Sequence, residues 1–159
     1  MTTYKELLTN NQTITASGLA SLANGSYFQL ASVDNTTNQD FDAGVLFKLK
    51  TGASGVTSAG YAGVYAYASP DGGTTWTDVA TGSAGSYSPP TPTNLILIGI
   101  VSATSNATTY IGGPFSVSKA FGYLPGKWGL VIFNNTGGAF DSTGGNFSVI
   151  YERLQGTSA

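Results

Sequence analysis

The stretch Val45-Leu-Phe-Lys-Leu-Lys50 has apolar residues at its odd positions and lysines at two of its three even positions. Successive side chains of a β-strand point to opposite faces of the sheet, so this alternation is typical of a strand with one buried face. We predict that the apolar residues at the odd positions face a hydrophobic core, while Lys48 and Lys50 lie on the opposite face. The stretch indicates a β protein.

Further strand-like segments lie on both sides of this stretch and are separated by clusters of Gly, Asn, Ser and Pro. Residues 95–101 and 128–133 are apolar on both faces, so both are predicted to be inner strands of a sheet. The last segment, residues 146–154, is predicted to turn Phe147, Val149 and Tyr151 inward. Together the eight or nine segments predict an all-β fold, a two-sheet β-sandwich of the jelly-roll type.

Residues 1–12 show no strand alternation and are predicted to form a short N-terminal arm, attached to a single sandwich domain of residues 13–159. Tyr4, Leu7 and Leu8 are spaced so that they share one face of a short helical turn. The arm is either a frayed terminus or a docking segment, and these three residues are the candidate partner interface. We expect a docking arm to order only against its partner.

Charged residues make up only 9% of the 159-residue chain, whereas average domains have about 25%. The six basic residues are scattered and the net charge is −2, so no concentrated basic surface for nucleic acid is expected. The longest apolar run, residues 95–101, is too short to cross a membrane, and the N-terminus has no apolar segment typical of a signal peptide. We therefore expect a protein made in a cytoplasm that binds neither nucleic acid nor membrane.

The chain contains neither His nor Cys, which removes the usual general base, the usual metal ligands and the nucleophilic triads. A glycosidase needs only two carboxylates, but the eight acidic residues lie mostly in predicted turns. Asp34, Asp40 and Asp42, with Asn35 and Asn38, offer oxygen ligands for calcium, although their spacing matches no defined calcium loop and turns explain them equally well. We predict no enzymatic activity, no catalytic residue, no cofactor and no metal.

Residues 69–76 read Ser-Pro-Asp-Gly-Gly-Thr-Thr-Trp and match the Asp-box pattern S-x-D-x-G-x-T-W, which is known from sialidases and related propellers. The motif residues are Ser69, Asp71, Gly73 and Trp76. The motif occurs once and the chain has a single Arg, so a sialidase propeller is excluded. The match implies a structural hairpin between strands at residues 65–69 and 74–79.

Tyr61, Tyr65 and Tyr67 fall on one face of the strand predicted over residues 60–69. Exposed aromatic rings offer apolar faces on which sugar rings stack, so this face is a candidate glycan-binding platform. Packing in the core or at an interface explains the same alternation, and we favour it over glycan binding.

Eight short segments follow one another along the chain: Ser21-Leu-Ala-Asn-Gly-Ser26, Val33-Asp-Asn-Thr-Thr37, Asp42-Ala to Lys50-Thr-Gly52, Tyr65-Ala-Tyr-Ala-Ser-Pro-Asp-Gly-Gly73, Leu97-Ile-Gly99, Gly113-Pro-Phe-Ser-Val117, Pro125-Gly-Lys-Trp128 and Asn134-Asn-Thr-Gly137. Together they resemble the small virion structural proteins of tailed bacteriophages, of the jelly-roll kind that decorate or cement capsids. The resemblance covers most of residues 19–152.

This resemblance implies a non-enzymatic protein on the exterior of the virion capsid, made in the host bacterial cytoplasm. Its partners would be the major capsid protein, whose lattice it binds and stabilises, and further copies of itself in a homo-oligomer, with a trimer as the favoured state. The resemblance carries over no catalytic or metal-binding residue. The alternative is a tail- or fibre-associated module that binds a glycan or a receptor.

Overall fold

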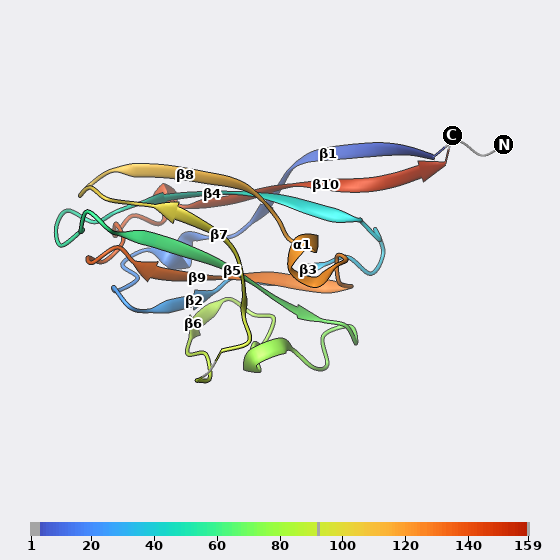
Figure 1. Cartoon of the computed structure of the whole chain (residues 1–159), viewed down its shortest axis with the longest axis horizontal. Coiled ribbons are helices and arrows are strands. Elements are labelled where there is room, and N and C mark those ends of the chain that lie inside the picture. The colour runs from blue at the N-terminus through green and yellow to red at the C-terminus, as the bar shows by residue number, and fades with distance from the viewer. Residues whose placement is uncertain (1–3, 92, 159) are drawn as a thin grey trace.

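The computed structural model describes residues 4–91 and 93–158, which form two antiparallel β-sheets packed face to face (Figure 1). The smaller sheet has four strands in the order β1-β10-β4-β8. The larger sheet has the order β6-β2-β9-β5-β7, with the short strand β3 paired to β9. The predicted all-β sandwich is confirmed.

The four-stranded sheet consists of β1 (Tyr4–Ile14), β10 (Ser148–Ser158), β4 (Asp42–Lys50) and β8 (Thr109–Ser116). The larger sheet consists of β6 (Gly85–Tyr87), β2 (Tyr27–Gln29), β9 (Lys127–Asn135), β5 (Tyr61–Ser69), β7 (Ile96–Ser102) and β3 (Val33–Asp34). The helices are short: the 3-10 helices η1 (Ser17–Leu19), η2 (Thr77–Val79) and η3 (Gly144–Asn146), and α1 (Ser118–Phe121). No helix in the described part of the chain has the length and apolar character to cross a membrane.

The strand order is nested. With the short strands β3 and β6 set aside, β1 pairs with β10, β2 with β9, β4 with β8, and β5 with β7. A long hairpin wound into two sheets has this nesting, which fits the jelly roll expected from the sequence.

The core lies between the two sheets, and β4 shows how the sequence builds it. Val45, Phe47 and Leu49 are fully buried, whereas Lys48 and Lys50 lie partly exposed on the outer face, as the alternation predicts. This arrangement fixes the pairing register of β4. A slip of one residue would expose the three apolar side chains and place both lysines in the core.

Trp128 of β9 connects the two layers. Its indole is buried and meets the ring of Tyr151 on β10 edge-on, with ring centroids 5.3 Å apart. β9 has β2 and β3 on one side and β5 on the other, so the prediction of an inner strand at residues 128–133 is confirmed. Phe147, just before β10, and Val149 and Tyr151 of β10 also face the core as predicted.

The prediction of an inner strand at residues 95–101 is wrong. β7 pairs with β5 alone and forms an edge of the larger sheet. Val101 on its inner face is buried, whereas Leu97 and Ile100 on its outer face are 46% and 50% exposed. No second layer covers the outer face of β7 in the described structure. Its apolar residues Leu97 and Ile100 instead form part of an apolar surface that is exposed to solvent.

The predicted hairpin partner of β5, a strand at residues 74–79, does not form, and η2 takes its place. Asp78 and Val79 have φ angles of 53° and 55°, in the left-handed region that is incompatible with a strand. The Asp78 carboxylate accepts hydrogen bonds from the backbone N–H groups of Asn94 and Leu95, at 2.6 and 3.0 Å. Residues 70–95 therefore form a long connection between β5 and β7, which we term the excursion, instead of the second strand of a hairpin. The hydrogen bonds of Asp78 hold the two ends of its second half together.

Candidate interaction surfaces

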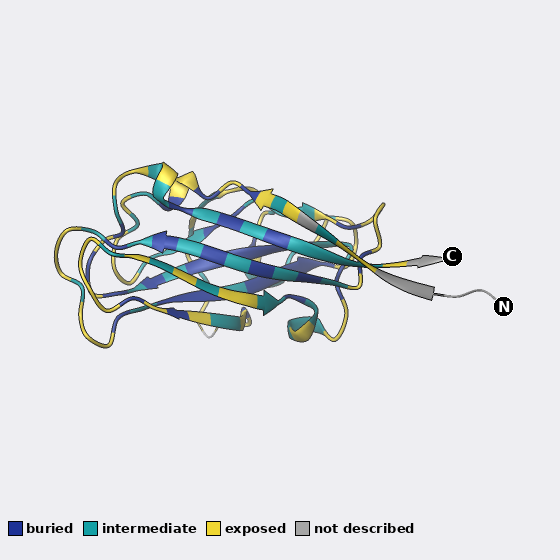
Figure 2. Cartoon of the chain, turned by 90° about the horizontal axis from the view of Figure 1, so that it is seen from above, coloured by how far each residue is buried: buried dark blue, intermediate teal, exposed yellow. Residues whose placement is uncertain are grey.

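β1 and β10 project beyond the body of the sandwich and carry both ends of the described chain (Figures 1 and 2). β4 pairs with β10 only as far as Leu154, whereas β1 pairs with β10 as far as Ser158. Residues 4–8 and 154–158, which we term the ribbon, pair with each other, and past Leu154 they have no third strand among the described residues. A two-stranded sheet without further packing is marginally stable in water, so contact with another molecule would stabilise the ribbon.

β1 is a strand where the sequence predicts a short helical turn for Tyr4, Leu7 and Leu8, and the prediction of the helical turn is wrong. The strand crosses the expected boundary between residues 12 and 13, interrupted only by a bulge between Thr9 and Gln12. Its partner β10 lies at the far end of the chain, so no pattern within residues 1–12 indicates the pairing.

Two of the three predicted interface residues are exposed on the ribbon: Leu7 is 49% and Leu8 is 59% exposed. Because they are consecutive in a strand, they point to opposite faces. Tyr4 belongs to the tip of the ribbon, and its side chain lies outside the described part of the structure. Near the base of the ribbon the ring of Phe41, 57% exposed, packs on Gly156. The ribbon thus presents apolar side chains to solvent on both faces.

A buried ion pair anchors the base of the ribbon. The Asp40 carboxylate lies 3.8 Å from Arg153 Nε and accepts a hydrogen bond from Gln155 Nε2 at 2.7 Å. The Asp40 N–H donates to Asn35 Oδ1 at 2.8 Å, and Asn35 Nδ2 donates to the Asp40 carbonyl at 3.2 Å. β10 is therefore tied to the loop before β4 just where it leaves the sheet, which fixes the direction in which the ribbon projects.

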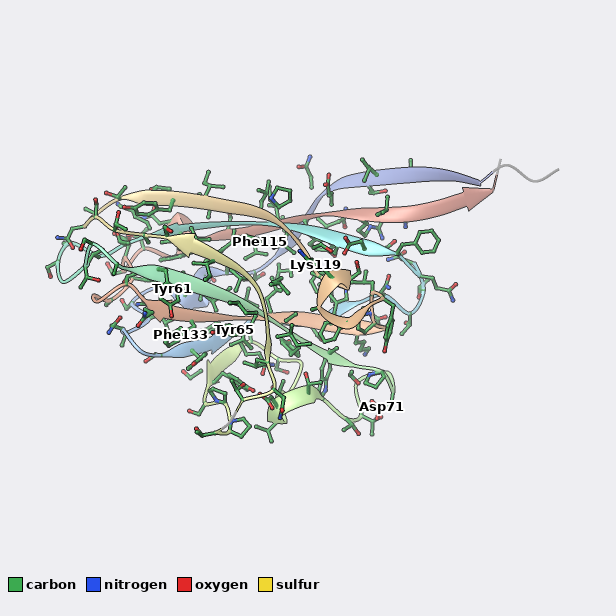
Figure 3. The ribbon with its side chains drawn as sticks, in the orientation of Figure 1. Tyr61, Tyr65, Asp71, Phe115, Lys119 and Phe133 are labelled. Carbon is green, nitrogen blue, oxygen red and sulfur yellow. The ribbon has the colours of Figure 1, made fainter. Side chains whose placement is uncertain are left out.

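The outer face of the larger sheet carries an aromatic cluster, which we define as Tyr27, Tyr61, Tyr65 and Phe133 (Figure 3). Tyr27 stacks on Phe133 with ring centroids 4.3 Å apart, and Tyr61 meets Phe133 edge-on at 6.4 Å. Gly63 lies opposite Phe133 in register and leaves room for the ring of Tyr65. Burial, and then the neighbouring Tyr27 and Tyr61, raise the pKa of Tyr65 above its ordinary value.

Tyr67 shares the face of Tyr61 and Tyr65 on β5, but it is covered and not exposed. Its side chain is fully buried, and its hydroxyl donates a hydrogen bond to the Leu30 carbonyl at 2.7 Å. Burial raises its pKa well above the usual value. Trp76 of the excursion packs against it, with ring centroids 5.4 Å apart. The predicted platform of three tyrosines is thus reduced to Tyr61 and Tyr65.

The four residues of the Asp-box motif hold the turn that follows β5. Asp71 Oδ1 accepts hydrogen bonds from the Thr75 N–H at 2.8 Å and the Ser69 hydroxyl at 2.7 Å. Ser69 Oγ accepts one from the N–H of Gly73, whose φ of 100° disfavours any side chain, and Trp76 Nε1 donates to the Gly73 carbonyl. The hydrogen bonds that Asp71 itself accepts, the one from the Thr75 N–H first, lower its pKa to about 2. Asp71 therefore acts as a structural cap of the turn.

The three aspartates considered for calcium point to separate partners. Asp34 pairs with Lys127 at 3.6 Å, and Asp40 with Arg153 at 3.8 Å. Asp42 accepts hydrogen bonds from the Ser116 hydroxyl and from the Ser118 N–H, and both serines follow the bulge in β8. Across residues 4–91 and 93–158 no three acidic side chains come together in a group that would hold a metal ion.

Comparison of the chain with protein-family models, with curated proteins and with solved structures finds no match. A fold of this kind hosts many unrelated functions, so the functional interpretation depends on the surfaces themselves. The ribbon and the aromatic cluster are both surfaces suited to binding.

Proposed function

We propose that the protein is a structural protein of a tailed-bacteriophage virion, which decorates or cements the capsid by binding the lattice of the major capsid protein. The observation that carries this proposal is the ribbon, which extends beyond the rigid sandwich, carries two exposed leucines and has no third described strand past Leu154. The ordered segments between residues 21 and 137 that resemble phage decoration proteins support the same function. The protein acts by contact alone.

Such a protein stabilises a shell by mass action, because it binds the assembled lattice and not the dissociated subunits. We further propose that it forms a homo-oligomer, with a trimer as the favoured state, on the capsid exterior after synthesis in the host bacterial cytoplasm. An oligomer presents several ribbons to the lattice at once, and multivalent attachment raises avidity without new contacts.

The proposal is tested with parent phage particles that lack this protein. Purified protein added back should sediment with the particles, saturate at a fixed number of copies per shell, and raise the temperature at which the particles release their DNA. Gold-labelled protein should cover the head in electron micrographs. Label confined to the tail, or no saturable binding, would reject the proposal.

The aromatic cluster favours a second candidate function, a tail- or fibre-associated module that binds a glycan or a receptor. Tyr61, Tyr65 and Phe133 lie together on one surface beside the exposed apolar residues of β7 (Figure 3). Under this alternative, Tyr61→Ala would abolish binding to host surface polysaccharide in a pull-down, while Ile111→Ser on the other sheet would not. Equal binding by both variants and the wild type would remove the cluster from consideration.

A further inference from the structure

A hollow of about 240 Å³ opens on the outer face of the four-stranded sheet. We use the term hollow for the space lined by Asn11, Gly44, Leu46, Pro114, Ile150, Tyr151 and Glu152. It lies away from the core, because the residues of β4 that line it alternate with buried Ala43, Val45 and Phe47. The hollow is separate from the ribbon and from the aromatic cluster.

The hollow results from a missing side chain between two bulges. Gly44 on β4 lies opposite Glu152 on β10, so the middle of the sheet has no side chain from β4 at this level. Both edge strands shift register beside it, β1 around Asn11, which has a φ of 62°, and β8 around Pro114. Bulges re-aim side chains and are over-represented next to functional sites. Here they raise the walls of the hollow on both sides.

The hollow combines apolar walls with one carboxylate. Glu152 is the charged residue of the lining, and its Oε1 lies 3.2 Å from where a Cβ on Gly44 would stand. Within the described residues Glu152 makes no hydrogen bond or ion pair. Burial raises the pKa of Asp42, two residues from Gly44 on the same face, but hydrogen bonds from Ser118 and Ser116 outweigh burial and the net shift is downward. Asp42 and Glu152 thus place two acidic side chains on this face.

The lysines nearest in the sheet do not compensate this charge. Lys48 lies on the same face but four residue pairs away from the Gly44–Glu152 pair, opposite Ser148. Lys119 of α1 is exposed (Figure 3), and neither lysine forms an ion pair with Glu152 in the described structure. The hollow is therefore complementary to a positive charge carried on an apolar stem.

We propose that the hollow binds a lysine or arginine side chain of a partner protein. The aliphatic stem packs on Leu46, Ile150 and Pro114, and the cationic head pairs with the Glu152 carboxylate. Long basic side chains characteristically bury their stems along apolar surface while the charged head stays near water. The inference goes beyond the proposed function, because it requires neither the ribbon nor a capsid.

The test is a methyl NMR titration of the full chain with Nα-acetyl-lysine amide and Nα-acetyl-arginine amide. Both probes should shift the methyl signals of Leu46 and Ile150 in a saturable manner, and added salt should weaken the binding. The uncharged probe Nα-acetyl-norleucine amide should bind more weakly. Glu152→Gln should weaken binding of the basic probes about three- to fivefold, the range of a partly exposed ion pair.

Two further variants keep the test specific. Gly44→Ala leaves the charge in place but adds a Cβ 3.2 Å from Glu152 Oε1, so it should also weaken binding. Asp34→Asn removes an exposed carboxylate at a distant site and should bind like the wild type. Equal binding of the norleucine probe, wild-type affinity in Glu152→Gln, or no saturable shift in the wild type would each overturn the inference. Failure of the particle experiment with success here would reject only the proposed function.

Discussion

Replacing both ribbon leucines, as Leu7→Ser with Leu8→Ser, should remove most of the attachment to particles. Complete burial of a leucine side chain contributes about 1.5–3 kcal/mol. Leu7 and Leu8 are 49% and 59% exposed, so about half of that value is still available from each on contact with a partner. The two together would contribute roughly 1.5–3 kcal/mol, and their loss should weaken attachment about 10- to 150-fold.

The same double substitution should barely change the melting temperature of the sandwich. Past Leu154 the ribbon has no third strand, so it is expected to open locally at a lower free energy than the core. Co-sedimentation over a range of protein concentrations measures attachment, and circular dichroism measures melting. The matched control is Ile111→Ser, which removes a residue that is 67% exposed on β8, at the opposite edge of the same sheet. Saturation of particles by the double variant at the wild-type concentration, or equal weakening by the control, would refute the reasoning.

Three further predictions concern the folded domain. Asp71→Ala should lower the melting temperature by a few degrees and leave attachment unchanged, because the carboxylate caps a turn; unchanged melting with lost attachment would instead give Asp71 a binding role. Because the folded-state pKa of Asp71 is about 2 and its ordinary value is 3.8, the stabilisation that it provides is present above about pH 4 and is lost as the pH falls towards 2. The difference in melting temperature between wild type and Asp71→Ala should therefore shrink from pH 6 to pH 2, and a constant difference would contradict this. Tyr67→Phe leaves the buried Leu30 carbonyl without its hydroxyl donor and should cost about 1–2 kcal/mol in urea unfolding, whereas an unchanged midpoint would show that this hydrogen bond contributes nothing.

Patterns confined to a single strand could be predicted from the sequence. The alternation in β4 identifies its buried face, and the apolar run of β9 identifies an inner strand. The same kind of run in β7 does not, because a local pattern reports which faces are apolar and not whether another strand lies alongside. The break at Asp78 was missed because its left-handed conformation depends on hydrogen bonds with Asn94 and Leu95, well removed in sequence.

The candidate surfaces were predicted only in part for the same reason. Leu7 and Leu8 could be identified as apolar residues in an unusual terminus, but the strand that carries them is set by β10 at the other end of the chain. Tyr61, Tyr65 and Tyr67 share one face of β5, yet only the position of the excursion separates the buried Tyr67 from the partly exposed pair. The sequence of residues 1–12 does not indicate the pairing with β10, and the sequence of β5 does not indicate which of its tyrosines is covered.

The pairing of β1 with β10 also has a consequence for biosynthesis. The Thr9 hydroxyl donates a hydrogen bond to Gln155 Oε1 across a separation of 146 residues. The first strand therefore leaves the ribosome long before its partner exists, and contacts of such high sequence separation slow folding. During that interval β1 is an unpaired strand, of the kind that exposes nascent chains to aggregation. A nascent chain that stops before residue 148 should thus lack two strands of the four-stranded sheet, because β1 would have no neighbour to pair with and only β4 and β8 would remain.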